Sequence, residues 1–213
     1  MKSGSLVRIV WAVAFVAPVA LAAAPRSADA CGTAVYREID NSSQLVAAAE
    51  QALSEGKLAK AAQKAVQAYP ALKIVKPGAT PLSDRALRIM ALAATRADGG
   101  LTIGTMHGTS VAEREANLEW SVETLKKLNE KRANNPSIQT DMAEAMAKVP
   151  KYRDEALKIL TQLSDKDLLT SAEGYAALAR LKAASGDAPG KELAVKRCET
   201  MSKTPSNCAV PSA

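Results

Sequence analysis

The sequence predicts an all-α fold, and three observations carry that prediction. Alanine, the strongest helix former, occupies 43 of the 213 positions. Apolar residues recur at helical offsets of three and four, as in the run from Leu45 to Leu53. No stretch sustains the alternation of period two that marks a half-buried strand, so we expect no sheet. The expected helices are residues 42–54, 57–69, 82–97, 110–133, 136–148, 151–163, 170–184 and 190–203.

Capping signals agree with the expected helix starts. Ser110 with Glu113, and Thr170 with Glu173, have the form of capping boxes, in which a hydroxyl accepts from a free backbone N–H and the carboxylate reaches back. Asn135-Pro136 places a capping residue before a proline at the first helical position. We therefore expect helices to begin at these three places.

Glycines and short joints predict helix ends and antiparallel pairs. Gly56, Gly99 and Gly186 each follow a periodic run, where a left-handed residue ends a helix. Several joints span only about two to six residues, which makes neighbouring helices pack as hairpins. Two joints are longer. Residues 70–81 contain three prolines and are predicted to be a spacer, and residues 98–109 hold four glycines and the only histidine.

The helical segment resembles the tetratricopeptide repeat (TPR). Hairpins are expected to start near residues 42, 82, 136 and 170, and the last spacing equals the 34-residue length of that repeat. Small and apolar residues after the first turn follow its pattern, although Ala65 is smaller than usual at its place. Segments 152–163 and 174–187 resemble a second and a first repeat helix. The residues that match after the first turn are Gly56, Leu58, Ala61, Ala65 and Ala68.

This resemblance implies a short α-solenoid over residues 42–203, with 98–109 as an insertion loop. Single helical hairpins cannot bury their own apolar face, whereas stacked hairpins can. Arrays of this family hold peptides or protein surfaces in a groove lined by the first helix of each pair. Counting back from the two turn glycines, the resemblance places Glu50 and Arg180 at equivalent groove positions. Their apolar neighbours, Val46 with Ala47 and Ala176 with Ala177, indicate a groove that suits a helix or an apolar segment better than a charged tail. The alternative is a generic bundle of antiparallel helices.

The first thirty residues have the form of an export signal. A basic start precedes sixteen uncharged residues, 9–24, and a small-residue cleavage site. That stretch would rise about 24 Å as a helix, short of the roughly 30 Å that spans a bilayer core. We expect residues 1–30 to be a signal peptide cleaved after Ala30, followed by a linker over 31–41. The alternative is a retained membrane anchor.

Cleavage after Ala30 makes Cys31 the first mature residue, which resembles a bacterial lipoprotein. The signal departs from the usual pattern at Asp29. Lipid on Cys31 would attach the protein to a membrane; ordinary cleavage would leave it free in the periplasm or secreted.

Two cysteines at the carboxyl end are expected to form a disulfide. Cys198 and Cys208 are ten positions apart, and an exported chain favours disulfides. Their bond would fasten the tail, residues 204–213, to the last helix, and Cys31 would be the one cysteine outside that disulfide. The alternatives are three free thiols, or pairing of Cys31 elsewhere.

Composition excludes several functional classes. A net charge of +6 without clustering, and only 3% aromatic residues, argue against nucleic-acid binding. One histidine and three cysteines fit no metal-site spacing. Nothing in the sequence places a catalytic partner beside His107, so we expect no catalytic residues and no cofactor.

The expected function is therefore that of a non-enzymatic scaffold in the bacterial cell envelope. We expect it to bind an envelope or secreted protein in its groove, with membrane contact only through lipid on Cys31. The alternatives are a small-ligand carrier, or an accessory enzyme subunit with a site near loop 98–109. The oligomeric state stays open.

Overall fold

A computed structural model describes residues 40–203 and 205–210 of the chain. Contacts divide the chain into two units, Met1–Glu38 and Ile39–Ala213, and every described residue belongs to the second. The predicted signal peptide, its cleavage after Ala30 and the lipidation of Cys31 lie outside the described residues.

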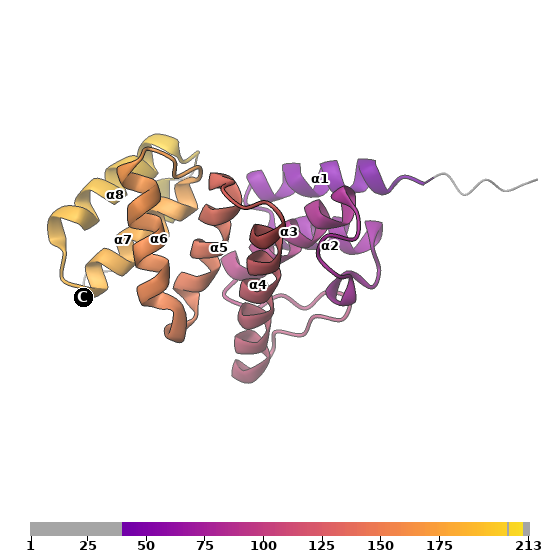
Figure 1. Ribbon diagram of the computed structural model, residues 1–213. Coiled ribbons are helices and arrows are strands. Elements are labelled where there is room, and N and C mark those ends of the chain that lie inside the picture. The colour runs from indigo at the N-terminus through magenta and orange to yellow at the C-terminus, as the bar shows by residue number, and fades with distance from the viewer. Residues whose placement is uncertain (1–39, 204, 211–213) are drawn as a thin grey trace, which may run out of the picture. The chain divides into compact units, whose positions relative to one another are not determined.

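The described residues fold into helices without a sheet, which confirms the all-α class (Figure 1). They form eight α-helices and three short 3₁₀ turns, and they contain no strand, only an isolated bridge between Ile103 and Met106. The α-helices are α1 (Ser42–Ser54), α2 (Leu58–Ala68), α3 (Pro81–Arg96), α4 (Val111–Lys131), α5 (Pro136–Lys148), α6 (Arg153–Asp165), α7 (Ala172–Ala184) and α8 (Ala188–Met201). The 3₁₀ turns are η1 (Leu72–Ile74), η2 (Pro150–Tyr152) and η3 (Pro205–Cys208).

Neighbouring helices pack as four pairs, α1 with α2, α3 with α4, α5 with α6, and α7 with α8 (Figure 1). The second helix of each pair also contacts the first helix of the next pair. In addition, the first helices contact one another in order, α1 with α3, α3 with α5, and α5 with α7. The four first helices therefore form a continuous series within the described chain.

The first and last pairs turn in the same way. Gly56 and Gly186 have φ of 72° and 76°, the left-handed conformation that glycine adopts without strain. In each turn the glycine N–H and the N–H after it donate to the last free carbonyls of the preceding helix, at 2.9–3.1 Å. This common turn confirms both predicted helix ends.

Most predicted caps are present, and two details differ. Ser110 with Glu113 forms a capping box, and the Asn135 side chain accepts from the first turn of α5. The predicted Thr170 box is wrong, because Ser171 caps α7 by accepting from Gly174 N at 3.0 Å. Glu173 is thereby free to bond elsewhere.

The start of α8 also lies earlier than predicted. Asp187 caps the helix by accepting from Gly190 N at 2.9 Å, and Pro189 stands in the first turn. Proline is tolerated there because first-turn N–H groups have no partner within the helix. Pro189 and Gly190 therefore lie in the first turn of α8, which begins at Ala188.

Alanine supplies much of the core. Small side chains let helices approach closely, and the α1–α2 interface is built largely from them. Longer side chains such as Leu125, Met146 and Leu160 fill the space between later helices and are also fully buried. The alanines of the α1–α2 interface, each at most 2% exposed, are Ala49, Ala52, Ala61, Ala62 and Ala65.

The predicted spacer at 70–81 is packed against the helices. Leu72 of η1 is 1% exposed, and Asp84 accepts from Gly78 N at 2.6 Å. Trp120 of α4 lies half-buried and donates from Nε1 to Lys73 O at 3.3 Å. The segment therefore fixes the α2–α3 connection, and Trp120 serves packing.

The predicted disulfide between Cys198 and Cys208 is present. Both residues are buried, at 0% and 1% exposure. The bond holds η3 against α8, and η3 also contacts α7.

Candidate functional site

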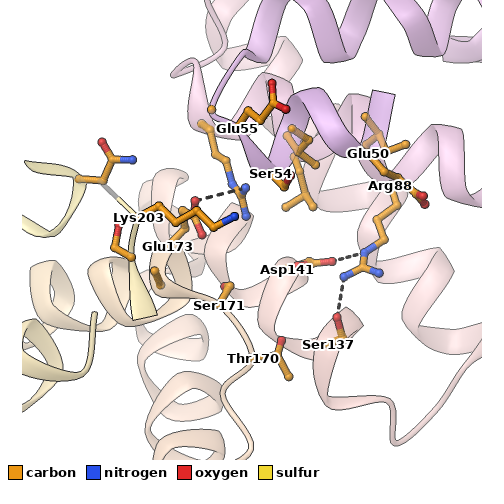
Figure 2. A pocket seen from close by; sticks show the side chains of 18 of the residues that line it. Glu50, Ser54, Glu55, Arg88, Ser137, Asp141, Thr170, Ser171, Glu173 and Lys203 are labelled. Carbon is orange, nitrogen blue, oxygen red and sulfur yellow. Dashed lines mark hydrogen bonds and ion pairs between the residues drawn. The ribbon is translucent and has the colours of Figure 1, made fainter. Parts of the chain in front are cut away.

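The series of first helices borders two adjoining cavities of about 710 Å³ and 280 Å³. Residues of α1, α3, α5 and α7 line the larger cavity, together with the segment after α8 (Figure 2). The same helices line the smaller one. We call the two cavities together the groove, because five residues line both. These are Leu53, Gly56, Arg96, Glu173 and Asn207.

Three arginines of α3 form the centre of the groove. On α3, Arg88 follows Arg85 by three positions, and Arg96 follows Arg88 by eight. These spacings place all three side chains on one face of the helix. Arg85 pairs with a carboxylate of α1, Arg88 with one of α5, and Arg96 with one of α5 and one of α7. These pairs therefore connect α3 to its neighbours as well as lining the groove.

Arg85 binds Glu50 of α1 through two hydrogen bonds, with Nε–Oε1 at 2.8 Å and Nη2–Oε2 at 2.6 Å. Both side chains are 43% exposed. Hydrogen bonding by Glu50 raises the pKa of Arg85. Because solvent screens the pair, its net contribution to stability is about 0–1 kcal/mol.

Arg88 joins α3 to the start of α5. Its Nε donates to the Asp141 carboxylate, and its Nη2 donates to Ser137 Oγ at 2.6 Å (Figure 2). The Asp141 side chain is only 4% exposed. Burial raises the pKa of Asp141 from 3.8 to about 6, although the charge of Arg88 opposes that rise.

Arg96 joins three helices at the boundary between the two cavities. It donates to both carboxylate oxygens of Glu144 on α5, at 2.9 and 3.0 Å, and lies 3.5 Å from Glu173 on α7. Burial alone would lower the pKa of Arg96, but the charges of Glu144 and Glu173 raise it overall. This buried guanidinium therefore stays charged.

The structure places both predicted groove residues on the groove. Glu50 lines the larger cavity, where it is held by Arg85, and Arg180 lines the smaller one. Arg180 donates from Nη2 to Asn207 O at 3.3 Å. The two residues therefore share the groove without contacting each other.

The lining is more charged than the sequence led us to expect. Val46, predicted as an apolar groove neighbour, is fully buried in the core, and Ala47 is exposed away from both cavities. Ala176 and Ala177 do line the smaller cavity. Elsewhere in the lining, ion pairs between helices stand beside apolar side chains such as Leu53, Ile89 and Leu92.

Sequence reasoning missed this arginine row and its buried partners. The signal is present in α3, where arginines recur on one face of a helix whose other residues are mostly buried. Asp141 and Glu144 on α5 gave no comparable signal. Their partners on α3 lie 53 and 48 residues away, so only packing brings them together.

The disulfide-held tail forms one wall of the groove. Met201, Ser202, Lys203 and Asn207 line the larger cavity, and the bond between Cys198 and Cys208 spans that segment. The fastening of the tail therefore also shapes the groove.

Loop 98–109 is fixed to α4 by Asn117. The Asn117 side chain is 1% exposed and donates from Nδ2 to Gly99 O at 2.9 Å and to His107 O at 2.7 Å. Gly99 has φ of 72°, and a Cβ there would lie 2.2 Å from Arg114 O. The His107 side chain is exposed. The loop is thus a packed connection between α3 and α4.

Two further properties concern only the described residues. They contain no group of three or more histidine, cysteine, aspartate or glutamate side chains arranged to hold a metal ion. None of their helices has the length and apolar character needed to cross a bilayer.

Comparisons of the chain with family models, with curated proteins and with solved structures found no match.

Proposed function

We propose that the protein is a TPR-like, non-enzymatic interaction module of the bacterial cell envelope, which holds a segment of a partner protein in the groove. The observation that carries this proposal is the groove itself, lined by the first helix of all four pairs. In TPR arrays the first helices line the binding surface, and here the same helices contact one another in order.

A solenoid arrangement of the four pairs is part of the proposal. The succession of contacts between first helices supports it, because a bundle around one centre would also bring the second helices together. The common turns at Gly56 and Gly186 support it too, since repeated units reuse one turn geometry.

The envelope location rests on the sequence of the first thirty-one residues. Mass spectrometry of the mature amino terminus tests it. A terminus at Cys31 carrying diacylglycerol supports membrane attachment, and an unmodified Cys31 supports a periplasmic or secreted protein. A full-length chain beginning at Met1 in the cytoplasm contradicts the location.

Binding in the groove is tested by photo-crosslinking in cells. A photoreactive residue at Ser54 lies on the larger cavity, and one at Gln162 of α6 is the control, exposed but away from both cavities. We expect one defined adduct from Ser54 and none from Gln162.

The crosslinked protein, once purified, should bind the wild-type chain and lose affinity for the double variant Glu50→Lys/Arg180→Glu. Unchanged affinity of this variant, or equal adducts from both positions, would contradict a groove-binding function.

A further inference from the structure

We infer that the groove recognises an acidic segment of its partner, and that Arg180 and Lys203 bind the carboxylate side chains of that segment. This inference rests on the proposed function. It follows from which charges on the groove already have partners.

The charged residues of the groove almost neutralise one another. Seven basic and six acidic side chains line the two cavities. All six acidic side chains lie within ion-pair distance of a basic side chain that also lines the groove. These pairs are Lys57–Glu55, Arg85–Glu50, Arg88–Asp141, Arg96–Glu144, Arg96–Glu173 and Lys148–Asp98.

Two cations remain without a carboxylate partner among the described residues, Arg180 and Lys203. Arg180 is exposed, and its hydrogen bond goes to a neutral acceptor, the backbone oxygen of Asn207. Lys203 is exposed at the edge of the larger cavity and is directed into it (Figure 2). Asn207 lines both cavities and so lies between the two sites.

An incoming carboxylate meets favourable charge at this end of the groove. The groove acids already accept from their own cations, so their repulsion of an anion is reduced. Arg96 and Asp141 are held by buried contacts and are poorly placed to exchange partners. Arg180 and Lys203 are available for a new partner, because neither forms an ion pair with a carboxylate of the described residues.

The positions of the two cations favour acidic side chains over a single chain terminus. Lys203 lines the larger cavity and Arg180 the smaller one, so each faces its own part of the groove. An extended peptide places alternate side chains on one face about 6.5–7 Å apart. A segment with several aspartates or glutamates along its length offers a carboxylate to each cation, which a single chain terminus does not.

Fluorescence anisotropy with defined peptides tests this inference. The main probe is a fluorescein-labelled, amidated decapeptide of alternating alanine and glutamate. The comparison probes replace glutamate with glutamine, once with an amidated and once with a free carboxyl terminus. The proteins are the wild type, Arg180→Glu/Lys203→Glu, and the charge-matched control Arg153→Glu/Lys158→Glu, whose residues are exposed on α6 away from the groove.

We expect the wild type and the control to bind the glutamate peptide about tenfold or more tightly than either glutamine peptide, with the preference falling at high salt. Arg180→Glu/Lys203→Glu should lose the preference. Arg180→Gln/Lys203→Gln should weaken it without introducing negative charge, and circular dichroism should show that every variant is folded.

Several results would overturn the inference. They are equal binding of glutamate and glutamine peptides, a preference that survives Arg180→Glu/Lys203→Glu, tight binding only of the free carboxyl terminus, and no binding of the glutamate peptide. Any of these, together with a specific crosslink from Ser54, leaves the groove function standing and rejects only the acidic chemistry. Loss of that crosslink as well rejects both.

Discussion

Replacing Arg96 with methionine should destabilise the protein severely, because Arg96 neutralises a buried carboxylate. The Glu144 side chain is 5% exposed and that of Arg96 is 15% exposed. Arg96→Met leaves Glu144 charged and unpaired between α3 and α5. Breaking a buried ion pair in this way typically costs about 3–5 kcal/mol. For a domain of this size that loss lowers the melting temperature by roughly 6–20 °C.

The same helix offers a matched control in Arg85→Met. Arg85 and Glu50 form the same two-bond geometry, but both side chains are 43% exposed. Water and salt can solvate Glu50 once its partner is gone. We therefore expect a loss of about 0–1 kcal/mol. The difference between the two variants mainly measures burial, because residue type, helix and the two-bond pattern are shared, and the additional partner of Arg96, Glu173, is 35% exposed.

A double variant separates the buried charge from lost packing. In Arg96→Met/Glu144→Met both charges are absent, and apolar side chains of similar length fill the site. Replacing a whole buried pair by apolar residues is often neutral or stabilising. We expect the double variant to recover most of the stability that Arg96→Met loses. Two carboxylates stay near the site, Glu173, which is 35% exposed, and Asp141, which keeps its own partner Arg88.

Urea denaturation followed by circular dichroism provides the free energies of unfolding. A cost for Arg96→Met of under about 1 kcal/mol, or no greater than that for Arg85→Met, would contradict the role assigned to Arg96. That role is also refuted if the double variant is as unstable as Arg96→Met alone. The first result would mean that leaving the Glu144 carboxylate unpaired costs little, and the second that lost packing, not the buried carboxylate, determines the cost.

Three further tests concern other parts of the structure. The pKa of Asp141 in the folded state, about 6, exceeds its ordinary value of 3.8, so its contribution to stability falls as the pH rises between these values. Urea denaturation at a series of pH values should show the free energy of unfolding of the wild type falling by up to about 3 kcal/mol relative to Asp141→Asn as the pH rises from 3.8 to about 6. If the two proteins give parallel plots of unfolding free energy against pH, this role of Asp141 is wrong. Cys198→Ser should lower the free energy of unfolding by about 2–3 kcal/mol and speed amide hydrogen exchange near Cys208. Exchange at the wild-type rate would show that the disulfide does not hold the tail. Asn117→Ala should cost about 1–3 kcal/mol because two carbonyls lose their donor, whereas His107→Ala should stay within about 0.5 kcal/mol; the reverse order in thermal denaturation would contradict the assigned roles.

Local chemistry made the helices predictable. Periodic apolar residues, Asn135 with Pro136, and the turn glycines Gly56 and Gly186 act over a few residues along the chain, so they can be read without knowing the fold. The exact cap of α7 was missed, since Thr170 and Ser171 are both able to cap and packing chose the second.

The candidate site was predictable only in outline. The repeat resemblance placed Glu50 and Arg180, and both line the groove. It did not show that Glu50 is held by Arg85, which lies on another helix. The apolar residues next to Glu50 and Arg180 in the sequence predict an apolar groove. In the structure, however, many of the side chains that line the groove are the charged ones through which α1, α3, α5 and α7 contact one another.

The sequence by itself determined the helical class, the turns and the pairing of Cys198 with Cys208, because each depends on residues close along the chain or on a short count of cysteines. Tertiary structure decided which charges meet. Arg88 and Arg96 find carboxylates 53 and 48 residues away, and Arg85 finds one 35 residues away. Many such pairings are compatible with the same helices, and only packing α3 between α1 and α5 selects these and leaves Arg180 and Lys203 without a carboxylate among the described residues.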